Sequence, residues 1–253
     1  MYNIIKRLFD IILSLIGLII LVPFTIIIKV LFLLCRDKGK IMYNQKRIGK
    51  DGKPFNIHKY RTMVVNADEM LDELLKDEKY KEEWDLNQKI EDDPRITTVG
   101  KFLRKTSLDE LPQLINVVKG DMALIGPRPL LTWFLPLYDE TQMRRHEVRP
   151  GITGWAQVNG RNTVTYGEKF KYDVWYVDHL TMWLDIKILW MTVMNVLKRK
   201  DIGNGLQAVA AANMDFETAA ALGHPFEVDD LGWNARKKEA IELFEKNFRN
   251  KQS

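Results

Sequence analysis

The feature that most constrains this chain is an apolar run near its N-terminus. Residues 11–35 read IILSLIGLIILVPFTIIIKVLFLLC and contain a single charge, Lys29. As one straight helix the run would extend about 37 Å, more than the roughly 30 Å of a bilayer hydrocarbon core. It is too long for a cleavable signal peptide, and no small-residue cleavage site follows it. We therefore expect a segment that enters a membrane.

Two features predict that this run enters the membrane without crossing it. Pro23 divides the run into two arms of about 18 Å each, and proline kinks or interrupts a helix. Both flanks are basic, and the positive-inside rule then keeps both in the cytoplasm. We expect a re-entrant helical hairpin over residues 1–36; the alternative is a kinked single span with its N-terminus outside. The basic flanks are Lys6 and Arg7 on one side and Arg36, Lys38 and Lys40 on the other.

Composition and local charge limit the function of the remaining chain. The 253 residues are 46% hydrophobic with a net charge of +4, as in one globular domain with appendages. Nine Lys or Arg against two Asp lie between residues 36 and 61, so local basic blocks can face phosphates or an anionic membrane. The single Cys35 and four scattered histidines predict neither a disulfide nor a zinc site.

Hydrophobic periodicity predicts a mostly helical α+β fold, with a small cytoplasmic domain over residues 37–203. It contains short strands, among them a pair around the turn at 49–54, and interfacial amphipathic helices. Trp183 and Trp190 favour a membrane surface for the last helix of this domain. We expect helices over residues 66–85, 101–106, 108–119, 164–177 and 182–200.

A C-terminal extension of unknown role follows over residues 204–253. Its charged amphipathic helix, expected over 234–248, has an apolar stripe that needs a partner surface. That surface belongs either to its own domain or to a second copy of the chain in a homodimer.

Two acids, Asp109 and Glu110, stand side by side in the segment TSLDELPQLINVVKG. Ser107 as helix N-cap forms a capping box with Glu110 but puts Pro112 inside the helix, whereas Asp109 as N-cap keeps Pro112 in the first turn. Either way the acids lie at a helix N-terminus, where they can flank one Mg²⁺ ion or one phosphate. A carboxylate is also a competent nucleophile toward phosphorus. The two residues alone leave a helix cap and a phosphate site as alternatives.

Five segments of this chain form long and specific motifs. They are KRLFD at 6–10, KYRTM at 59–63, the stretch from DPRITTVG to GPRPLL at 93–131, RPGITGWAQVNGRN at 149–162, and KYDVWYVDHLTMWLDIKIL at 171–189. With these motifs the chain resembles the bacterial sugar transferases of the monotopic phosphoglycosyl transferase family, and the resemblance makes residues 37–203 the catalytic domain. It covers roughly residues 3–203 and departs from the family in two places: Val22 rather than serine precedes Pro23, and residues after 203 have no family counterpart.

The resemblance implies transfer of a phosphosugar from a UDP-sugar to polyprenyl (undecaprenyl) phosphate, with UMP released and a covalent aspartyl-phosphosugar intermediate. It makes Asp109 the nucleophile, Asp109 and Glu110 the ligands of Mg²⁺, and Arg128 of the Pro-Arg-Pro loop a phosphate ligand. It also implies a monotopic protein of the bacterial cytoplasmic membrane, facing the cytoplasm, that initiates glycan assembly. Weaker candidates for substrate binding are Lys59, Arg61, Arg104, Arg149 and Arg161.

The alternative function is a non-catalytic membrane scaffold that gathers glycan-assembly enzymes, with the acid pair merely capping a helix. Release of UMP separates the two, because a scaffold produces none. Binding of nucleic acid through the basic blocks is disfavoured, since the apolar N-terminus has no place in it. The sequence does not identify the sugar.

Overall fold

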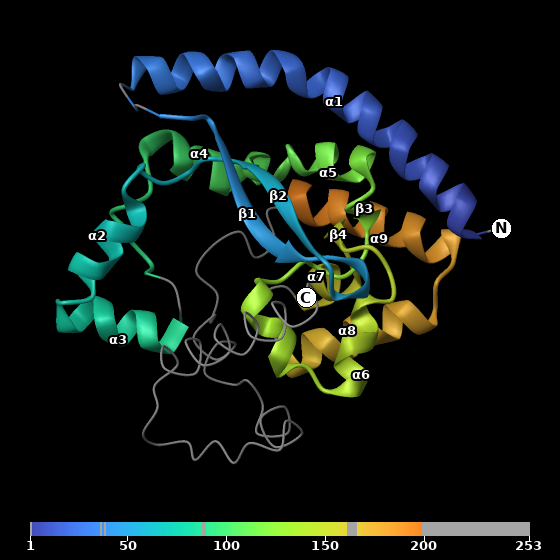
Figure 1. Ribbon diagram of the computed structural model, residues 1–253. Coiled ribbons are helices and arrows are strands. Elements are labelled where there is room, and N and C mark those ends of the chain that lie inside the picture. Colours follow the sequence, from blue (N-terminus) through green and yellow to red (C-terminus); the bar gives the residue numbers. More distant parts are fainter. Residues whose placement is uncertain (1, 36, 38, 88–89, 161–165, 199–253) are drawn as a thin grey trace, which may run out of the picture.

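The computed structural model describes residues 2–35, 37, 39–87, 90–160 and 166–198 of the protein. They form a mostly helical α+β domain with two small sheets, and the long helix α1 lies along one side of it (Figure 1). The helices are α1 (Tyr2–Leu34), α2 (Ala67–Leu74), α3 (Glu78–Asn87), α4 (Thr98–Thr106), α5 (Gln113–Lys119), α6 (Glu140–Met143), α7 (Trp155–Asn159), α8 (Tyr166–Asp178) and α9 (Met182–Leu197). The strands are β1 (Met42–Ile48), β2 (Pro54–Tyr60), β3 (Ala123–Ile125) and β4 (Gly151–Thr153), and the 3-10 turns are η1 (Lys50–Gly52), η2 (Leu108–Glu110), η3 (Thr132–Leu137) and η4 (Arg144–His146).

Helix α1 is continuous from Tyr2 to Leu34 and includes Pro23. Figure 1 shows it as one bent ribbon, so the expectation of a two-armed hairpin is wrong for this structure. Proline removes one backbone hydrogen bond and bends a helix, and here the contacts with the domain continue on both sides of the bend. Leu21 and Ile28, on either side of Pro23, are both buried. Entry of α1 into a membrane stays a prediction.

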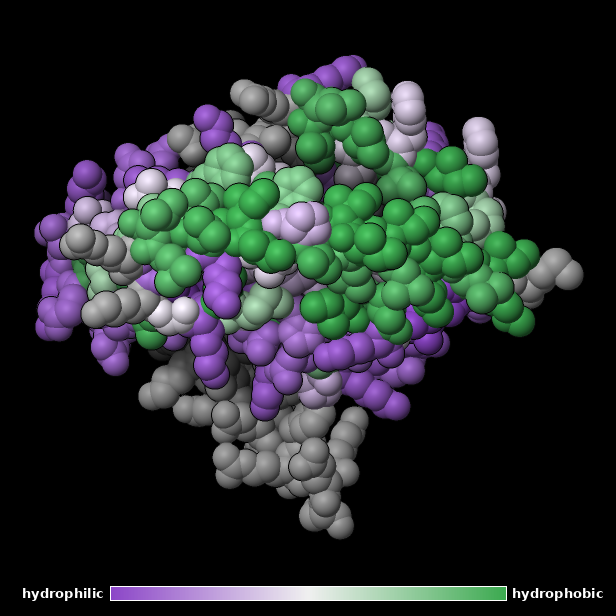
Figure 2. Space-filling view, turned by 90° about the horizontal axis from the view of Figure 1, so that it is seen from above, coloured by the Kyte–Doolittle hydropathy of each residue, from purple (hydrophilic) through white to green (hydrophobic). Residues whose placement is uncertain are grey.

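The two faces of α1 differ sharply. One stripe, at helical spacing, faces the domain, and its C-terminal part packs on β2 and α4. The remaining surface is apolar and exposed, and Figure 2 shows it as a green band along the helix. Among the described residues, α1 is the helix long and apolar enough to cross a membrane. The buried stripe consists of Asp10, Ser14, Leu21, Ile28 and Phe32.

Polar contacts tie the start of α1 to segments far away in the sequence. Lys6 Nζ donates to Asp185 of α9 at 2.8 Å, and the backbone N–H of Leu124 donates to Asp10 at 3.2 Å. Arg7 Nη1 donates to the carbonyl of Val117 in α5 at 2.6 Å. These partners are separated by 179, 114 and 110 positions, so α1 closes the fold.

The two sheets carry the segments that build the functional site. Strands β1 and β2 form the predicted antiparallel pair, from Met42 opposite Tyr60 to Ile48 opposite Pro54. Strand β3 pairs in parallel with β4 and leads into the Gly-Pro-Arg-Pro loop. A Cβ atom at Gly126 would lie 2.4 Å from the carbonyl oxygen of Arg149, so this loop can start against β4 only with glycine.

Several helix predictions are confirmed and two are corrected. Helices α8 and α9 match the expected segments at 164–177 and 182–200 in their described parts. The segment 66–85 is two helices, because the chain turns at 75–77 and the Asp77 carboxylate accepts a hydrogen bond from the N–H of Lys79. The segment 108–119 is also divided, into η2 and α5, since Pro112 has no N–H to continue one helix. The expected helix at 234–248 lies outside the described residues.

Candidate active site

The acid pair lies on the short 3-10 turn η2, between α4 and α5. Ser107 ends α4 with a left-handed backbone (φ 56°) and makes no side-chain cap, while Pro112 rather than Asp109 precedes α5. Ser107 thus precedes η2 as expected but forms no capping box with Glu110, and the prediction of Asp109 as N-cap is wrong. The reversal at Ser107 turns the chain before the acids, which leaves their side chains unused by the helix termini.

Glu110 is held by two cations from different parts of the chain. Lys59 Nζ, near the end of β2, donates to Oε1 at 2.9 Å, and Arg128 Nη1 donates to Oε2 at 3.2 Å. Arg128 Nη2 also donates to Oε1, which makes the arginine contact bidentate. Burial alone would raise the pKa of Glu110, but the charges of Arg128 and Lys59 outweigh it and hold this pKa well below its usual range. Glu110 is therefore an ionised carboxylate at neutral pH.

Asp109 differs from its neighbour, because no hydrogen bond or ion pair to its carboxylate is found in the described part of the chain. The side chain is half-buried. Burial, and then the negative charge of Glu110, raise the pKa of Asp109, against the opposing charges of Lys59, Arg104 and Arg128. A carboxylate that is unpartnered, partly desolvated and close to three cations suits attack on an anionic phosphorus centre.

The loop that carries Arg128 is fixed from behind by a residue that the sequence did not suggest. Arg145 of η4 is buried and donates from Nη2 to the carbonyl of Arg128 at 2.8 Å. The same guanidinium donates from Nε to Asp173 of α8 at 3.0 Å and from Nη1 to the hydroxyl of Tyr138 at 3.0 Å. Arg145 thereby fixes the backbone of the Pro-Arg-Pro loop, whose Arg128 contacts Glu110.

The other residues predicted to bind substrate differ in whether they lie near the acid pair. Arg104, on the last turn of α4, is close enough for its charge to act on Asp109. Arg61 is directed elsewhere, since its guanidinium donates to the carbonyls of Lys40 and Met63 and to Asp37. Arg149 donates to the carbonyl of Gly120, at the opposite end of α5 from the acid pair. Arg161 lies outside the described residues.

Two cations near the Pro-Arg-Pro loop, Arg47 and Lys169, were not predicted from the sequence. Arg47 of β1 donates to the carbonyl of Pro129, next to Arg128, at 3.5 Å. Lys169 of α8 has its Nζ 4.9 Å from the ring centre of Tyr166. The strand register could have revealed Arg47, because residues at alternate positions of paired strands share a face and Lys59 is on that face.

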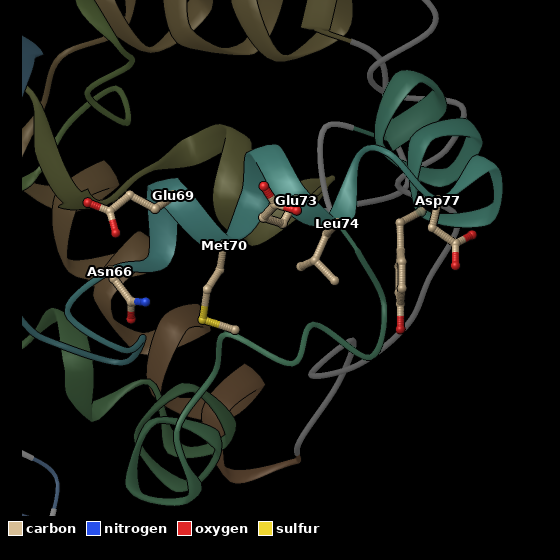
Figure 3. A pocket seen from close by; sticks show the side chains of 7 residues that line it. Asn66, Glu69, Met70, Glu73, Leu74 and Asp77 are labelled. Atoms are coloured by element: carbon tan, nitrogen blue, oxygen red, sulfur yellow. The ribbon is translucent and has the colours of Figure 1, made fainter.

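A separate open hollow of about 540 Å³ lies along α2 and α3, away from the acid pair. Figure 3 shows its apolar floor, with Met70 and Leu74, beside the acids Glu69, Glu73 and Asp77. Three carboxylates repel a nucleotide diphosphate, so this hollow does not suit a phosphorylated ligand.

Sequence comparisons identify the family of the chain. A profile of the bacterial sugar transferase family matches residues 1–199. The chain is 45% identical over 199 residues to the uncharacterized sugar transferase EpsL of Bacillus subtilis, with 79% of this chain and 90% of that protein covered. It is 46% identical over 195 residues to the undecaprenyl-phosphate galactose phosphotransferase of Salmonella typhimurium, with 77% of this chain and 40% of that protein covered.

A third relative is the UDP-glucose:undecaprenyl-phosphate glucose-1-phosphate transferase of Escherichia coli, 38% identical over 199 residues, with 76% of this chain and 40% of that protein covered. The chain thus spans about two fifths of the length of the Salmonella and Escherichia relatives. The family match extends over α1, the acid pair and α9 alike. From the agreement of motifs, profile and relatives, this chain belongs to the bacterial sugar transferase family.

Proposed function

We propose that this chain transfers a sugar 1-phosphate from a UDP-sugar to undecaprenyl phosphate and releases UMP. The names of two relatives include undecaprenyl phosphate, together with galactose in one name and UDP-glucose in the other. The observation that carries the proposal is the contrast within the acid pair. Glu110 is neutralised by Lys59 and Arg128, while Asp109 beside it has no partner among the described residues.

In the first step an Oδ atom of Asp109 attacks the sugar-bearing phosphorus of the donor. The new P–O bond forms as the bond from that phosphorus to the bridging oxygen breaks. The bridging oxygen keeps the electron pair and leaves as part of UMP. Lys59 and Arg128 offer donors to the non-bridging oxygens, where negative charge accumulates. The product is an acyl phosphate on Asp109 that carries the sugar.

In the second step a phosphate oxygen of undecaprenyl phosphate attacks the same phosphorus. The bond to Asp109 breaks and the carboxylate leaves with its electron pair, which restores the enzyme. The product is a sugar linked to undecaprenyl diphosphate. Because UMP leaves before the lipid reacts, the kinetics are ping-pong.

We propose Mg²⁺ as the cofactor, because the acid pair offers carboxylate oxygens that can bind it. Oε2 of Glu110 accepts one hydrogen bond, from Arg128, and so keeps a free lone pair beside the unpartnered Asp109. Mg²⁺ is usually held by one or two carboxylates together with substrate phosphates, and no group of three or more acids, His or Cys is found within the described residues. When bound, the ion neutralises part of the charge of the diphosphate.

For location we propose that α1 and α9 lie in one leaflet at the cytoplasmic side of the membrane. Trp183 and Trp190 of α9 are 76% and 66% exposed, as suits an interfacial helix. The domain contacts α1 on both sides of Pro23, so a straight span would draw the exposed Lys101 and Lys105 of α4 toward the hydrocarbon. The test replaces Cys35 with Ser and Asn3 with Cys; labelling of position 3 from outside intact cells contradicts this location.

The activity is tested by UMP release from a panel of UDP-sugars, with undecaprenyl phosphate as acceptor. Asp109→Asn keeps the size of the side chain, so we expect a folded protein with at least a thousandfold less turnover, on the order of other nucleophile losses. Asp92→Asn, an exposed acid on the loop before α4, is the matched control and should retain full turnover.

The intermediate is tested by withholding the lipid. Wild-type protein with its UDP-sugar alone should release one equivalent of UMP and gain the mass of one phosphosugar, and the peptide with Asp109 should carry it. Near-normal turnover of Asp109→Asn would refute the nucleophile. No UMP with any donor would instead favour the scaffold.

A further inference from the structure

Two further cations, Arg47 and Lys169, lie near Arg128, and the two steps above use neither of them. Arg128 is followed by Pro129, whose carbonyl accepts from Arg47 Nη1, and Arg47 is also bridged to Leu131 through backbone pairing. On the other side of the loop, Arg128 is close enough for its charge to act on Tyr166 and Lys169 of α8. Arg47, Arg128 and Lys169 thus surround the end of the Pro-Arg-Pro loop.

The register of β1 and β2 fixes where this cluster lies. Tyr43 is opposite Lys59 and Arg47 is opposite Phe55, so Lys59 and Arg47 share one face of the sheet. They are four residues apart along the ladder, or about 13 Å. The Lys59 end meets α1, because the next residue, Tyr60, packs in the cluster that contains Leu21 and Ile28. The Arg47 end is the one away from α1.

The charges at this end are not balanced within the described residues. Arg47 is bonded to Gln45 at 2.6 Å, but its buried Nε finds no partner there. Lys169 has no ion pair in the described part, and Asp173, whose charge acts on it, is paired with Arg145. Burial and the charge of Arg128 lower the pKa of Arg47 to about 10, so it stays a cation at neutral pH beside another cation. Such a cluster suits an anionic ligand.

Within the described residues, the fold uses part of the Arg47 guanidinium, since Nη2 donates to Gln45 at 2.6 Å while Nε has no partner. Its contact with the carbonyl of Pro129 is 3.5 Å long, at the limit of a hydrogen bond, and a guanidinium has five N–H donors. Lys169 contributes no hydrogen bond to the loop among those described. The two cations therefore keep donors that the fold does not use.

We propose that Arg47 and Lys169, together with Arg128, form a second phosphate subsite that takes the 5′-phosphate of the uridine nucleotide, the half of the donor that leaves. The inference rests on the proposed function. The subsite lies on the side of Glu110 away from α1, whereas the lipid phosphate approaches from the face that α1 and α9 expose. Holding the leaving phosphate opposite the lipid keeps the two substrates apart.

The experiment measures binding of UMP to the purified full chain by calorimetry. Arg47→Met and Lys169→Met should each weaken UMP binding about tenfold, as expected for the loss of one charged contact. Binding of uridine, which lacks the phosphate, and the KM for undecaprenyl phosphate should not change. The matched controls are Lys46→Met, an exposed neighbour on the opposite face of β1, and Lys171→Met, exposed on α8. Both should bind UMP as the wild type does.

Each outcome decides the proposal. Unchanged UMP affinity in folded Lys169→Met overturns the subsite, as does a raised KM for undecaprenyl phosphate with UMP affinity intact. If Arg47→Met lowers the thermal midpoint, Lys169→Met alone carries the test. A wild-type chain that releases UMP and binds it, with variants that bind equally well, refutes only the subsite. A wild-type chain that neither binds nor releases UMP refutes the proposed function itself.

Discussion

Two arginine–carboxylate pairs lie one behind the other in this protein, and they differ in what surrounds them. The side chains of Arg145 and Asp173 are 2% and 4% exposed, whereas those of Arg128 and Glu110 are 46% and 20% exposed. The inner arginine donates to Asp173, to Tyr138 and to the backbone of Arg128. The outer one donates from both Nη atoms to Glu110, and its side chain is nearly half exposed.

The difference shows that one type of ion pair can have two roles, one in structure and one in ligand binding. A buried pair with its donors satisfied contributes a fixed position, and removal of one partner leaves an uncompensated charge. A partly exposed pair contributes little to stability but keeps donors for a ligand. Since Arg145 binds the carbonyl of Arg128, the inner pair positions the outer one.

The largest effect is expected from Arg145→Met. It leaves the buried Asp173 without its cation, which should lower the free energy of unfolding by about 3–5 kcal/mol. Thermal or urea unfolding in detergent measures this. Arg145→Met combined with Asp173→Leu should recover part of the loss, because no charge then stays buried. Wild-type stability in the single variant would mean that the inner pair does not hold the fold.

Arg128→Met removes the arginine of the exposed pair and should reduce turnover far more than stability. Loss of a donor to the transition state costs about a hundredfold or more in turnover, while stability should change by at most about 1 kcal/mol, as for other exposed pairs. Arg128→Lys keeps the charge but not the bidentate geometry and should be intermediate. UMP release and thermal melting on the same samples provide both readouts. A large stability loss with turnover retained would reverse the comparison.

The pH dependence should report on the neighbours Asp109 and Glu110. Attack needs Asp109 ionised, and its pKa is raised, so kcat/KM should fall on acidification at a higher pH than an ordinary aspartate would give. Glu110→Gln removes one negative neighbour, which should move the pKa of Asp109 down. Carbon-13 NMR of labelled aspartate measures this without activity. An upward or absent shift contradicts the coupling.

The smallest effect is expected from Arg144→Met, next to Arg145 in the sequence. Arg144 pairs with Asp178 and Glu147, and all three side chains are more than two fifths exposed. Exposed pairs contribute little to stability, so the thermal midpoint and turnover should match the wild type. A drop comparable to that of Arg145→Met would show that burial is not what separates these pairs.

The parts of the fold with strong periodicity were predictable. The β1–β2 pair, α8 and α9 follow from local pattern, and Asp109, Glu110 and Arg128 follow from family resemblance. The chain reversal at Ser107 was not predictable, because a left-handed backbone is uncommon for a residue other than glycine. Arg145 could not be identified either, since its partner Asp173 is 28 positions away and only burial reveals the pair. Arg61 lies in a matching motif, yet its donors are directed to Lys40, Met63 and Asp37.

The contacts at the start of α1 set an order of events during synthesis. Lys6 emerges from the ribosome 179 residues before its partner Asp185, which at 5–20 residues per second is a delay of about ten to forty seconds. Through that interval the start of α1 lacks its partner in α9, and an exposed apolar segment aggregates in water. A lipid surface that binds α1 early would cover its apolar side chains until α9 has been synthesised and completes the fold beside it. Loss of the lipid surface would then favour aggregation of the nascent chain far more than aggregation of the folded protein.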